Sequence, residues 1–286
     1  MREAATYPPG VPCWVDTRQP DTAAAMAFYG GVFGWVFDAP IPAGDLGTYR
    51  IARLGGLAVA AIAGADGATM PGAAWTTYVR VDRLDEAVAA VTAAGGRVLT
   101  EPTELLDLAR VVAVADPAGA QFRLWEPRSL AGAQLVNEPA TWNWSTLQTH
   151  DPAGAEEFYA RVLGWEHTSI APGVEDVAMV CLPGYGEALR RADPALGAGV
   201  APDAPEGFAD AVAWMEPARG DRSGEQGAPH WSVTFSVADT DATVDRVVEL
   251  GGRVVTPPFD FPPVRTAEVA DPHGVVFAVS RYDPTA

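Results

Sequence analysis

The stretch WVDTRQPDTAAAMAFYGGVFGW (residues 14–35) decides the fold, because its pattern returns as WSTLQTHDPAGAEEFYARVLGW in residues 144–165. Both stretches open on a Trp in an alternating segment typical of a strand, and both pass through an Asp. Apolar residues then recur at three- and four-residue steps, which predicts a helix that ends on Gly-Trp. A strand and a helix are therefore written twice without a gap, and the repeat organises everything that follows.

A second pair of stretches extends this repeat. WTTYVRVDRLDEAVAAVTAAGGRVLTEP (residues 75–102) matches WSVTFSVADTDATVDRVVELGGRVVTPP (residues 231–258). Each is followed by a DPxG element, at residues 116–119 and 271–274. The two halves of the chain share one plan, and each half contains two units.

All four units predict the same order of elements. An acid near the start of each helix and a glycine at its end supply the expected caps. Short stretches rich in β-forming residues follow each helix, such as TYRIARL (residues 48–54) and QFRLWEP (residues 121–127). The unit is βαβββ. The acids are Asp21, Asp85, Asp151 and Asp241, and the glycines are Gly34, Gly95, Gly164 and Gly251.

The length of 286 residues is sufficient for two domains of ordinary size. We expect an α+β protein whose N-terminal domain covers residues 1–133 and whose C-terminal domain covers residues 134–286. The expected modules are residues 11–64, 73–128, 141–216 and 228–282. Residues 184–228 depart from the repeat and are expected to form an insertion, rich in Gly, Pro and charge, that could close over the second cavity.

The four βαβββ units, the FYxxxFGW helix end, the GGRV element and the DPxG turn resemble the vicinal oxygen chelate superfamily, which includes glyoxalases, bleomycin-resistance proteins and extradiol dioxygenases. The resemblance is greatest to two-domain members of the actinobacterial type. It implies curved mixed sheets around cavities, one cavity in each half, and a homodimer is a reasonable expectation for this family.

The resemblance also implies where metal ligands would stand, on the first strand of each unit and on the last strand. His, Glu or Gln from these strands converge on one divalent ion in the metal enzymes of the family. None of the six corresponding residues here is a usual ligand, so we expect no metal and no other cofactor. They are Trp14, Trp75, Arg123, Trp144, Trp231 and Ala278.

Tryptophans in place of metal ligands favour an aromatic or polycyclic guest, because an indole offers a flat apolar surface and one N–H donor. Strand alternation and the insertion supply the other candidates. The expected ligand contacts are Trp14, Arg18, Trp75, Thr77, Trp125, Trp144, Thr146, Gln148, Tyr185, Trp231 and Phe235, with Glu187 and Arg190 as further contacts from the insertion.

Three residues are candidates for acid–base chemistry. Asp16 shares a strand face with Trp14, and a carboxylate beside indoles could have a raised pKa and act as a base. Arg123 could hold an anionic oxygen, and His230 precedes Trp231. The alternatives are an ion-paired strand acid, a sheet-surface Arg and a structural His. These candidates favour the first half as the more chemical site.

Composition excludes several classes of function. The formal net charge of −18 opposes binding to nucleic acid or to an anionic membrane. No Lys is present, so a lysine Schiff base is unavailable. Cys13 and Cys181 stand far apart without a metal-binding spacing, and no run of apolar residues is long enough to cross a membrane. We expect a cytoplasmic protein whose partner is a small molecule.

Two functional hypotheses remain open on the sequence. One is a metal-independent protein that binds and sequesters an aromatic compound, as antibiotic-resistance members of the superfamily do. The other is a metal-free enzyme of secondary metabolism that isomerises, cyclises or opens a ring by acid–base catalysis. A metal-dependent glyoxalase or dioxygenase is disfavoured by the missing ligands.

Overall fold

The computed structural model describes residues 7–64, 74–169, 177–192, 204–218 and 227–283. Its strands form two mixed sheets, one of ten strands and one of eight. The strands of the N-terminal sheet come from residues 12–127, and those of the C-terminal sheet come from residues 141–282. Neither sheet closes into a barrel, since each strand order runs from one edge to the other.

Each half contains two βαβββ modules, with a few short additional elements, as the repeat predicts. The N-terminal half consists of β1 (Pro12–Arg18), α1 (Thr22–Phe33), β2 (Val36–Phe37), β3 (Ile41–Pro42), the 3-10 helix η1 (Gly44–Leu46), β4 (Thr48–Leu54), β5 (Leu57–Gly64), β6 (Trp75–Arg80), α2 (Leu84–Ala93), β7 (Arg97–Val98), β8 (Thr103–Leu105), β9 (Ala109–Ala115) and β10 (Gln121–Pro127). The C-terminal half consists of β11 (Thr141–Thr149), α3 (Pro152–Leu163), β12 (Glu166–Ser169), β13 (Ala178–Cys181), α4 (Tyr185–Ala192), the 3-10 helix η3 (Phe208–Asp210), β14 (Ala211–Pro217), β15 (His230–Ser236), α5 (Thr240–Glu249), β16 (Arg253–Phe261), β17 (Val264–Ala270) and β18 (Val276–Tyr282).

The sheets repeat one topology. The first strands of the two modules in each half, β1 with β6 and β11 with β15, pair antiparallel at the centre of the sheet. The strand that completes the first module then pairs in parallel with its own first strand, β5 with β1 and β14 with β11. β14 lies inside the range 184–228 that the sequence suggests as an insertion, so this part of the range belongs to the repeat unit.

The helix ends are formed as the sequence predicts. Asp21 and Asp151 are the N-caps of α1 and α3, and each side chain accepts a hydrogen bond from a backbone N–H three residues later. The other two acids, Asp85 and Asp241, lie in the first turns of α2 and α5. Gly34 ends α1 with a φ of 72°, a left-handed conformation that glycine adopts without strain, and Gly164 does the same for α3.

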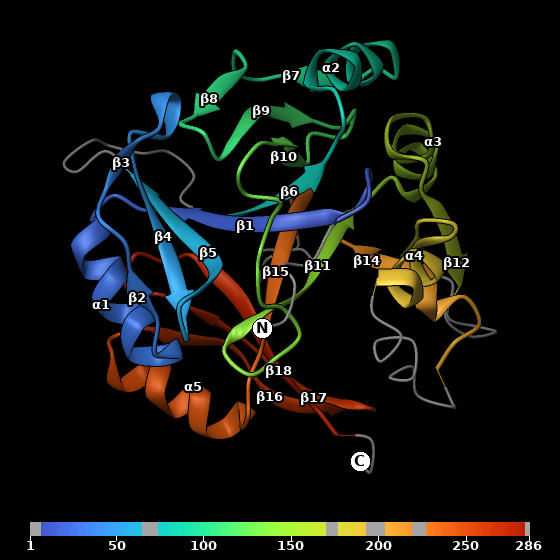
Figure 1. Cartoon of the computed structure of the whole chain (residues 1–286). Coiled ribbons are helices and arrows are strands. Elements are labelled where there is room, and N and C mark those ends of the chain that lie inside the picture. Colours follow the sequence, from blue (N-terminus) through green and yellow to red (C-terminus); the bar gives the residue numbers. More distant parts are fainter. Residues whose placement is uncertain (1–6, 65–73, 170–176, 193–203, 219–226, 284–286) are drawn as a thin grey trace.

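The two sheets pack against each other through what we call their inner faces. Thr77 Oγ1 on β6 and Ser145 Oγ on β11 lie 2.7 Å apart and form a hydrogen bond where the central strands meet. Figure 1 shows β1 and β15 crossing at this centre, with α1 beside α5 at one end and α3 near α2 at the other. The face of each sheet that points away from the other sheet is called its outer face.

At both ends of this interface a tyrosine of one half bonds to the DPxG aspartate of the other half. The Tyr29 hydroxyl donates to Asp271 at 3.0 Å, and the Tyr159 hydroxyl donates to Asp116 at 3.2 Å. Burial raises the pKa of Asp116, and its hydrogen bonds oppose that rise. The repeat therefore joins its halves by the same contact twice.

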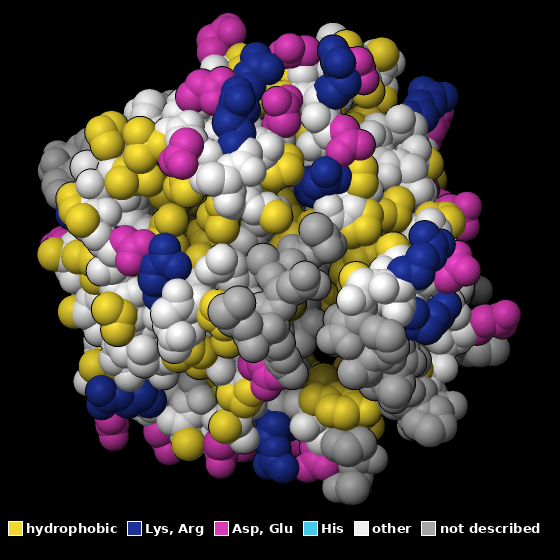
Figure 2. Space-filling view, viewed as in Figure 1, with side chains coloured by type: hydrophobic (Ala, Val, Ile, Leu, Met, Phe, Trp, Pro, Cys, Tyr) yellow, Lys and Arg dark blue, Asp and Glu magenta, His cyan; other side chains and the backbone are white. Residues whose placement is uncertain are grey.

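No helix in the described part of the chain is both long and apolar enough to span a membrane. On the face shown in Figure 2, Arg side chains lie beside Asp and Glu rather than in a patch of one sign. Several of these neighbours are ion pairs, such as Arg53 with Asp38 and Arg128 with Glu104.

Candidate functional site

The two outer faces can be compared position by position, because the strand registers match. One row on the N-terminal outer face runs Trp14, Tyr78, Arg123, Ala113 across β1, β6, β10 and β9. The corresponding row on the C-terminal outer face runs Trp144, Thr234, Ala278, Glu268 across β11, β15, β18 and β17. Side chains that pair across neighbouring strands lie on the same face of a sheet, so each row is a set of side-by-side neighbours.

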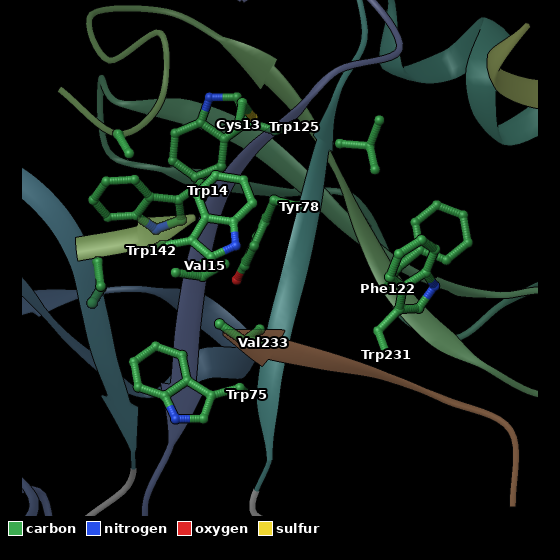
Figure 3. Close-up of a cluster of buried hydrophobic side chains, with 14 of the residues drawn as sticks. Cys13, Trp14, Val15, Trp75, Tyr78, Phe122, Trp125, Trp142, Trp231 and Val233 are labelled. Atoms are coloured by element: carbon green, nitrogen blue, oxygen red, sulfur yellow. The ribbon is translucent and has the colours of Figure 1, made fainter. Parts of the chain in front are cut away.

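The N-terminal outer face is filled by its own side chains. Trp14, Tyr78 and Trp125 are 0% exposed, and Arg123 is 4% exposed. The Trp14 indole donates to the Tyr49 hydroxyl at 2.7 Å, and its ring centroid lies 6.0 Å from that of Trp125. Figure 3 shows the rings of Trp14, Trp125 and Tyr78 gathered beside β1 and β6. This packing leaves a ligand no room on the described face.

Asp16 lies inside this packed cluster, on the same face as Trp14 and Arg18, as strand alternation predicts. Its carboxylate accepts a hydrogen bond from the Tyr78 hydroxyl. Complete burial raises the pKa of Asp16, while the positive charge of Arg123 and the Tyr78 hydrogen bond oppose the rise. Asp16 and Arg123 therefore lie near each other in a closed interior.

The C-terminal outer face is partly open. Trp144 and Trp214 are partly exposed, and their ring centroids lie 5.7 Å apart. Phe208 of η3 lies against Trp144, with ring centroids 5.9 Å apart. Thr146, beside Trp214 in the register, is also partly exposed. This face presents an aromatic cluster with hydroxyl groups around it.

Gln148 and His230 pair with each other across β11 and β15 at one end of this face. The Gln148 amide donates to Glu216 at 2.9 Å. His230 is exposed, and its Nδ1 lies 2.8 Å from the backbone oxygen of Ala228. The structure therefore places His230 on the opposite face from Trp231, as alternation predicts. His230 belongs to a different sheet from the Asp16 cluster.

Four residues expected in the cavities, Trp75, Thr77, Trp231 and Phe235, lie instead on the inner faces. The expectation that they line the cavities is wrong, because a β-bulge after Pro12 and another after Trp142 shift the strand register. Trp14 therefore pairs with Tyr78, and Trp144 pairs with Thr234, so Trp75 and Trp231 point to the opposite face of their sheets.

These inner-face residues have structural partners instead. The Trp75 indole donates to the Tyr29 hydroxyl at 3.2 Å, and the Trp231 indole donates to the Tyr159 hydroxyl at 3.0 Å. Phe235 packs against Phe33 of the N-terminal half. They complete the two cross-half contacts described above.

The three insertion residues expected as ligand contacts, Tyr185, Glu187 and Arg190, have no ring contact with Trp144 or Trp214 among the described residues. Tyr185 packs on the main hydrophobic core, and its burial raises its pKa to about 12. Glu187 forms an ion pair with Arg191 one turn along α4, and Arg190 is exposed. Phe208, which does reach Trp144, was missed by the sequence analysis because nothing in the local pattern sets the 3-10 turn η3.

Thr234, Trp214 and Glu268 were also missed as site residues. For Thr234 and Glu268 a signal was present in the sequence, since an offset of 155 or 156 residues relates the second modules of the two halves, whereas Trp214 belongs to a first module. Counting with that offset sets Thr234, Ala278 and Ser280 against Tyr78, Arg123 and Trp125. Side-chain volume is lost at these three positions of the C-terminal face, whereas Trp214 and Glu268 are larger than Ala61 and Ala113 at the matching positions of the N-terminal face.

Two hollows lie outside both outer faces. One of about 350 Å³ lies between α1 and α5 beside Val32 and Arg246, and another of about 300 Å³ lies beside Tyr7, Arg80 and Leu189. Apart from Arg80, which pairs with Trp125 on the N-terminal outer face, the residues that line these hollows are neither candidate site residues nor members of the rows compared above.

The residues present do not fit a resident divalent metal. Within the described ranges, no group of three His, Cys, Asp or Glu residues is placed to hold an ion. At the positions where the family resemblance implies ligands, the C-terminal outer face carries Trp144 and Ala278, and its acid Glu268 stands one strand further along.

Comparisons with known proteins agree with the fold. CFP32 of Mycobacterium tuberculosis, whose name gives glyoxylase only as a provisional assignment, is 35% identical over 291 residues, covering 99% of both chains. The anthracycline biosynthesis protein DnrV of Streptomyces peucetius is 35% identical over 293 residues, covering 96% of this chain and 94% of its own. The crystal structure of a Mn(II)-bound glyoxalase from Novosphingobium aromaticivorans matches with a TM-score of 0.60 at 15% identity, covering 97% of this chain and 85% of that one.

A family model also matches both halves, at residues 14–124 and 141–279. The resemblance and the fold expected from the repeat are thereby confirmed. The chain belongs to the Glyoxalase/Bleomycin resistance protein/Dioxygenase superfamily.

Proposed function

We propose that the protein binds a planar aromatic small molecule on its C-terminal outer face, without a metal. The observation that carries this proposal is the replacement of Tyr78, Arg123 and Trp125 by Thr234, Ala278 and Ser280 at equivalent positions. Large side chains fill the N-terminal outer face, and the smaller side chains of the C-terminal outer face leave space for the proposed ligand.

The aromatic cluster at one side of this face suits such a guest. Trp144, Trp214 and Phe208 present partly exposed rings, and aromatic pairs are stabilised beyond the area they bury. Hydroxyl groups of Thr146 and Ser232 lie in the adjoining row and can orient polar substituents of the ligand.

The relatives support the same class of ligand. DnrV carries anthracycline biosynthesis in its name, and anthracyclines are planar polycyclic compounds. Because this relative is 35% identical over nearly the whole chain, a polycyclic aromatic compound is the first class of ligand to test.

The acid–base alternative has weaker support. Its candidates Asp16 and Arg123 belong to the face that Trp14, Tyr78 and Trp125 fill. Its third candidate, His230, lies on the other sheet. A base needs its substrate within hydrogen-bond reach, and this packing gives a substrate no place beside Asp16.

Binding can be tested with 9-anthracenemethanol, a neutral planar probe, by tryptophan quenching and by calorimetry. We expect one molecule to bind per chain. Thr234→Tyr restores the bulk that Tyr78 supplies on the other face and should weaken binding at least about tenfold, equivalent to about 1.4 kcal/mol.

Thr92→Tyr is the matched control, because Thr92 is exposed on α2 of the other half. This substitution adds the same ring far from the site. Thermal melting of both variants checks that each folds. Equal weakening by the two variants, or unchanged affinity in a folded Thr234→Tyr protein, contradicts the proposed site.

A further inference from the structure

We infer that the ligand carries a protonated amine and that Glu268 binds it. This inference rests on the proposed function, since it concerns the same outer face. It names the chemical class of ligand, a planar aromatic cation, that the face would select.

Glu268 stands in the row that begins at Trp144. The row continues through Thr234 and Ala278 to Glu268 and then to Thr256 on β16. Neighbouring strands lie about 4.8 Å apart, so three steps separate Trp144 from Glu268 by roughly 14 Å along the sheet. That span suits a ligand whose rings lie over Thr234 and Ala278, with one edge against Trp144 and a short substituent at the carboxylate.

The side chain between them is small. Ala278 pairs directly with Glu268, so no bulky group separates the carboxylate from the middle of the face. The hydroxyl of Thr256 donates to Glu268 Oε2 at 2.5 Å and fixes one carboxylate oxygen. The partly exposed carboxylate can accept from a donor on the ligand.

The charges around Glu268 favour a cation over an anion. Among the described residues, no Arg forms a salt bridge with Glu268, and Arg265 on its own strand pairs with Asp241 and Asp260. The register assigns Arg253 to this face, but Arg253 is exposed at the start of the edge strand. The corresponding position on the N-terminal face is Ala113, beside Arg123, so the charge pattern there is reversed.

The aromatic cluster adds to the same preference. The faces of Trp rings attract cations, and Trp144 and Trp214 are both partly exposed here. The formal net charge of −18 further disfavours an anionic ligand.

Three probes with one ring system test the inference: 9-(aminomethyl)anthracene, 9-anthracenemethanol and 9-anthracenecarboxylate, which are cationic, neutral and anionic at pH 7. Their dissociation constants are measured by tryptophan quenching at low and at high salt. We expect the amine to bind about tenfold more tightly than the alcohol, and the carboxylate to bind most weakly.

Glu268→Gln should remove the advantage of the amine, so that the dissociation constants of the amine and the alcohol agree within about twofold. Glu156→Gln, which removes the same charge from the exposed surface of α3, should leave all three affinities unchanged. High salt should reduce the advantage of the amine in the wild type.

The outcomes separate the two proposals. Equal binding of the three probes, tighter binding of the carboxylate, or an unchanged preference in Glu268→Gln overturns the assignment of Glu268 and leaves the aromatic site standing. Binding of none of the probes by folded protein overturns the proposed function and the inference together.

Discussion

The two outer faces are built on one register and differ in what occupies it. On the N-terminal face, Tyr78, Arg123 and Trp125 are buried together with Asp16. On the C-terminal face, the equivalent side chains are those of Thr, Ala and Ser, and the neighbouring tryptophans stay partly exposed. Three large side chains help to close the N-terminal face, since protein interiors are close-packed and leave few voids, and the equivalent small side chains do not fill the C-terminal face.

Under the proposed function, this difference gives the two copies separate roles. The N-terminal copy buries its outer face in its own core, and the C-terminal copy keeps part of that face exposed. An exposed aromatic surface is costly to retain in a monomeric protein, so its retention in one copy is itself a reason to assign it a ligand. The expectation that the first half holds the site followed its polar residues, whereas the packing favours the second half.

The largest expected effect compares the two equivalent tryptophans. Trp14→Ala should lower the free energy of unfolding by about 3–5 kcal/mol, because it empties a fully buried site and removes the hydrogen bond to Tyr49. Trp144→Ala should cost roughly 1–2 kcal/mol, because its ring is already partly exposed. Urea unfolding monitored by circular dichroism gives both values.

The same pair separates stability from binding. Trp144→Ala should weaken binding of 9-anthracenemethanol about tenfold, at the scale expected for loss of an aromatic contact. An equal stability loss in the two variants would show that the C-terminal face is packed core as well, and the contrast between the faces would fail.

A smaller effect is expected at the two cross-half contacts. Tyr159→Phe removes the hydroxyl that donates to Asp116 and accepts from the Trp231 indole, and should cost about 1–3 kcal/mol. Tyr29→Phe should cost about 1 kcal/mol or less, because Asp271 also accepts from Gln19 Nε2 at 2.7 Å. Thermal unfolding of the two variants, measured side by side, checks the order.

These two changes also report on how the halves depend on each other. If the halves unfold as one unit, each variant should keep a single transition. Equal costs of the two changes would mean that Gln19 contributes little to Asp271 and that the two ends of the interface are equivalent, and a larger cost of Tyr29→Phe would contradict the prediction.

The sequence predicted the fold well because the repeat is strongly marked. The acids that it identifies are the N-caps of α1 and α3 and lie in the first turns of α2 and α5, and the glycines stand at or directly after the C-caps. The strands β4 and β10 coincide with the stretches TYRIARL and QFRLWEP. Face assignment was less successful, because a bulge near the start of β1 and of β11 changes which residues stand opposite each other. A one-residue change of register moves a side chain to the other face, and no local pattern announces a bulge.

The site was predicted in part. Trp14, Asp16 and Arg18 do share a face, and Trp144, Thr146 and Gln148 share its counterpart. The openness of the second face depends on the absence of bulk at Ala278 and Ser280, which becomes visible only when both copies are set in register. Phe208 reaches Trp144 through a turn outside the repeat, so only the folded chain brings them together.

The smallest expected effect sharpens the contrast at Asp16, whose counterpart is the uncharged Thr146. Asp16→Asn is nearly the same shape, so the comparison follows the change with pH rather than the absolute stability. Burial raises the pKa of Asp16 in the folded protein above its ordinary value near 4 in the unfolded chain. The unfolded chain therefore releases this proton first, and ionisation of Asp16 lowers stability as pH rises between the two values.

Stability of the wild type relative to Asp16→Asn should accordingly fall as pH rises from about 4 to the raised pKa, and should stay constant above it. Chemical unfolding of both proteins at a series of pH values gives this difference, and the other titrating groups cancel in it. A difference that rises with pH would mean that the positive charge of Arg123 outweighs burial and holds the pKa of Asp16 down. The N-terminal cluster would then be a buried ion pair whose carboxylate stays charged, and the filled face would have retained the electrostatics of a working site.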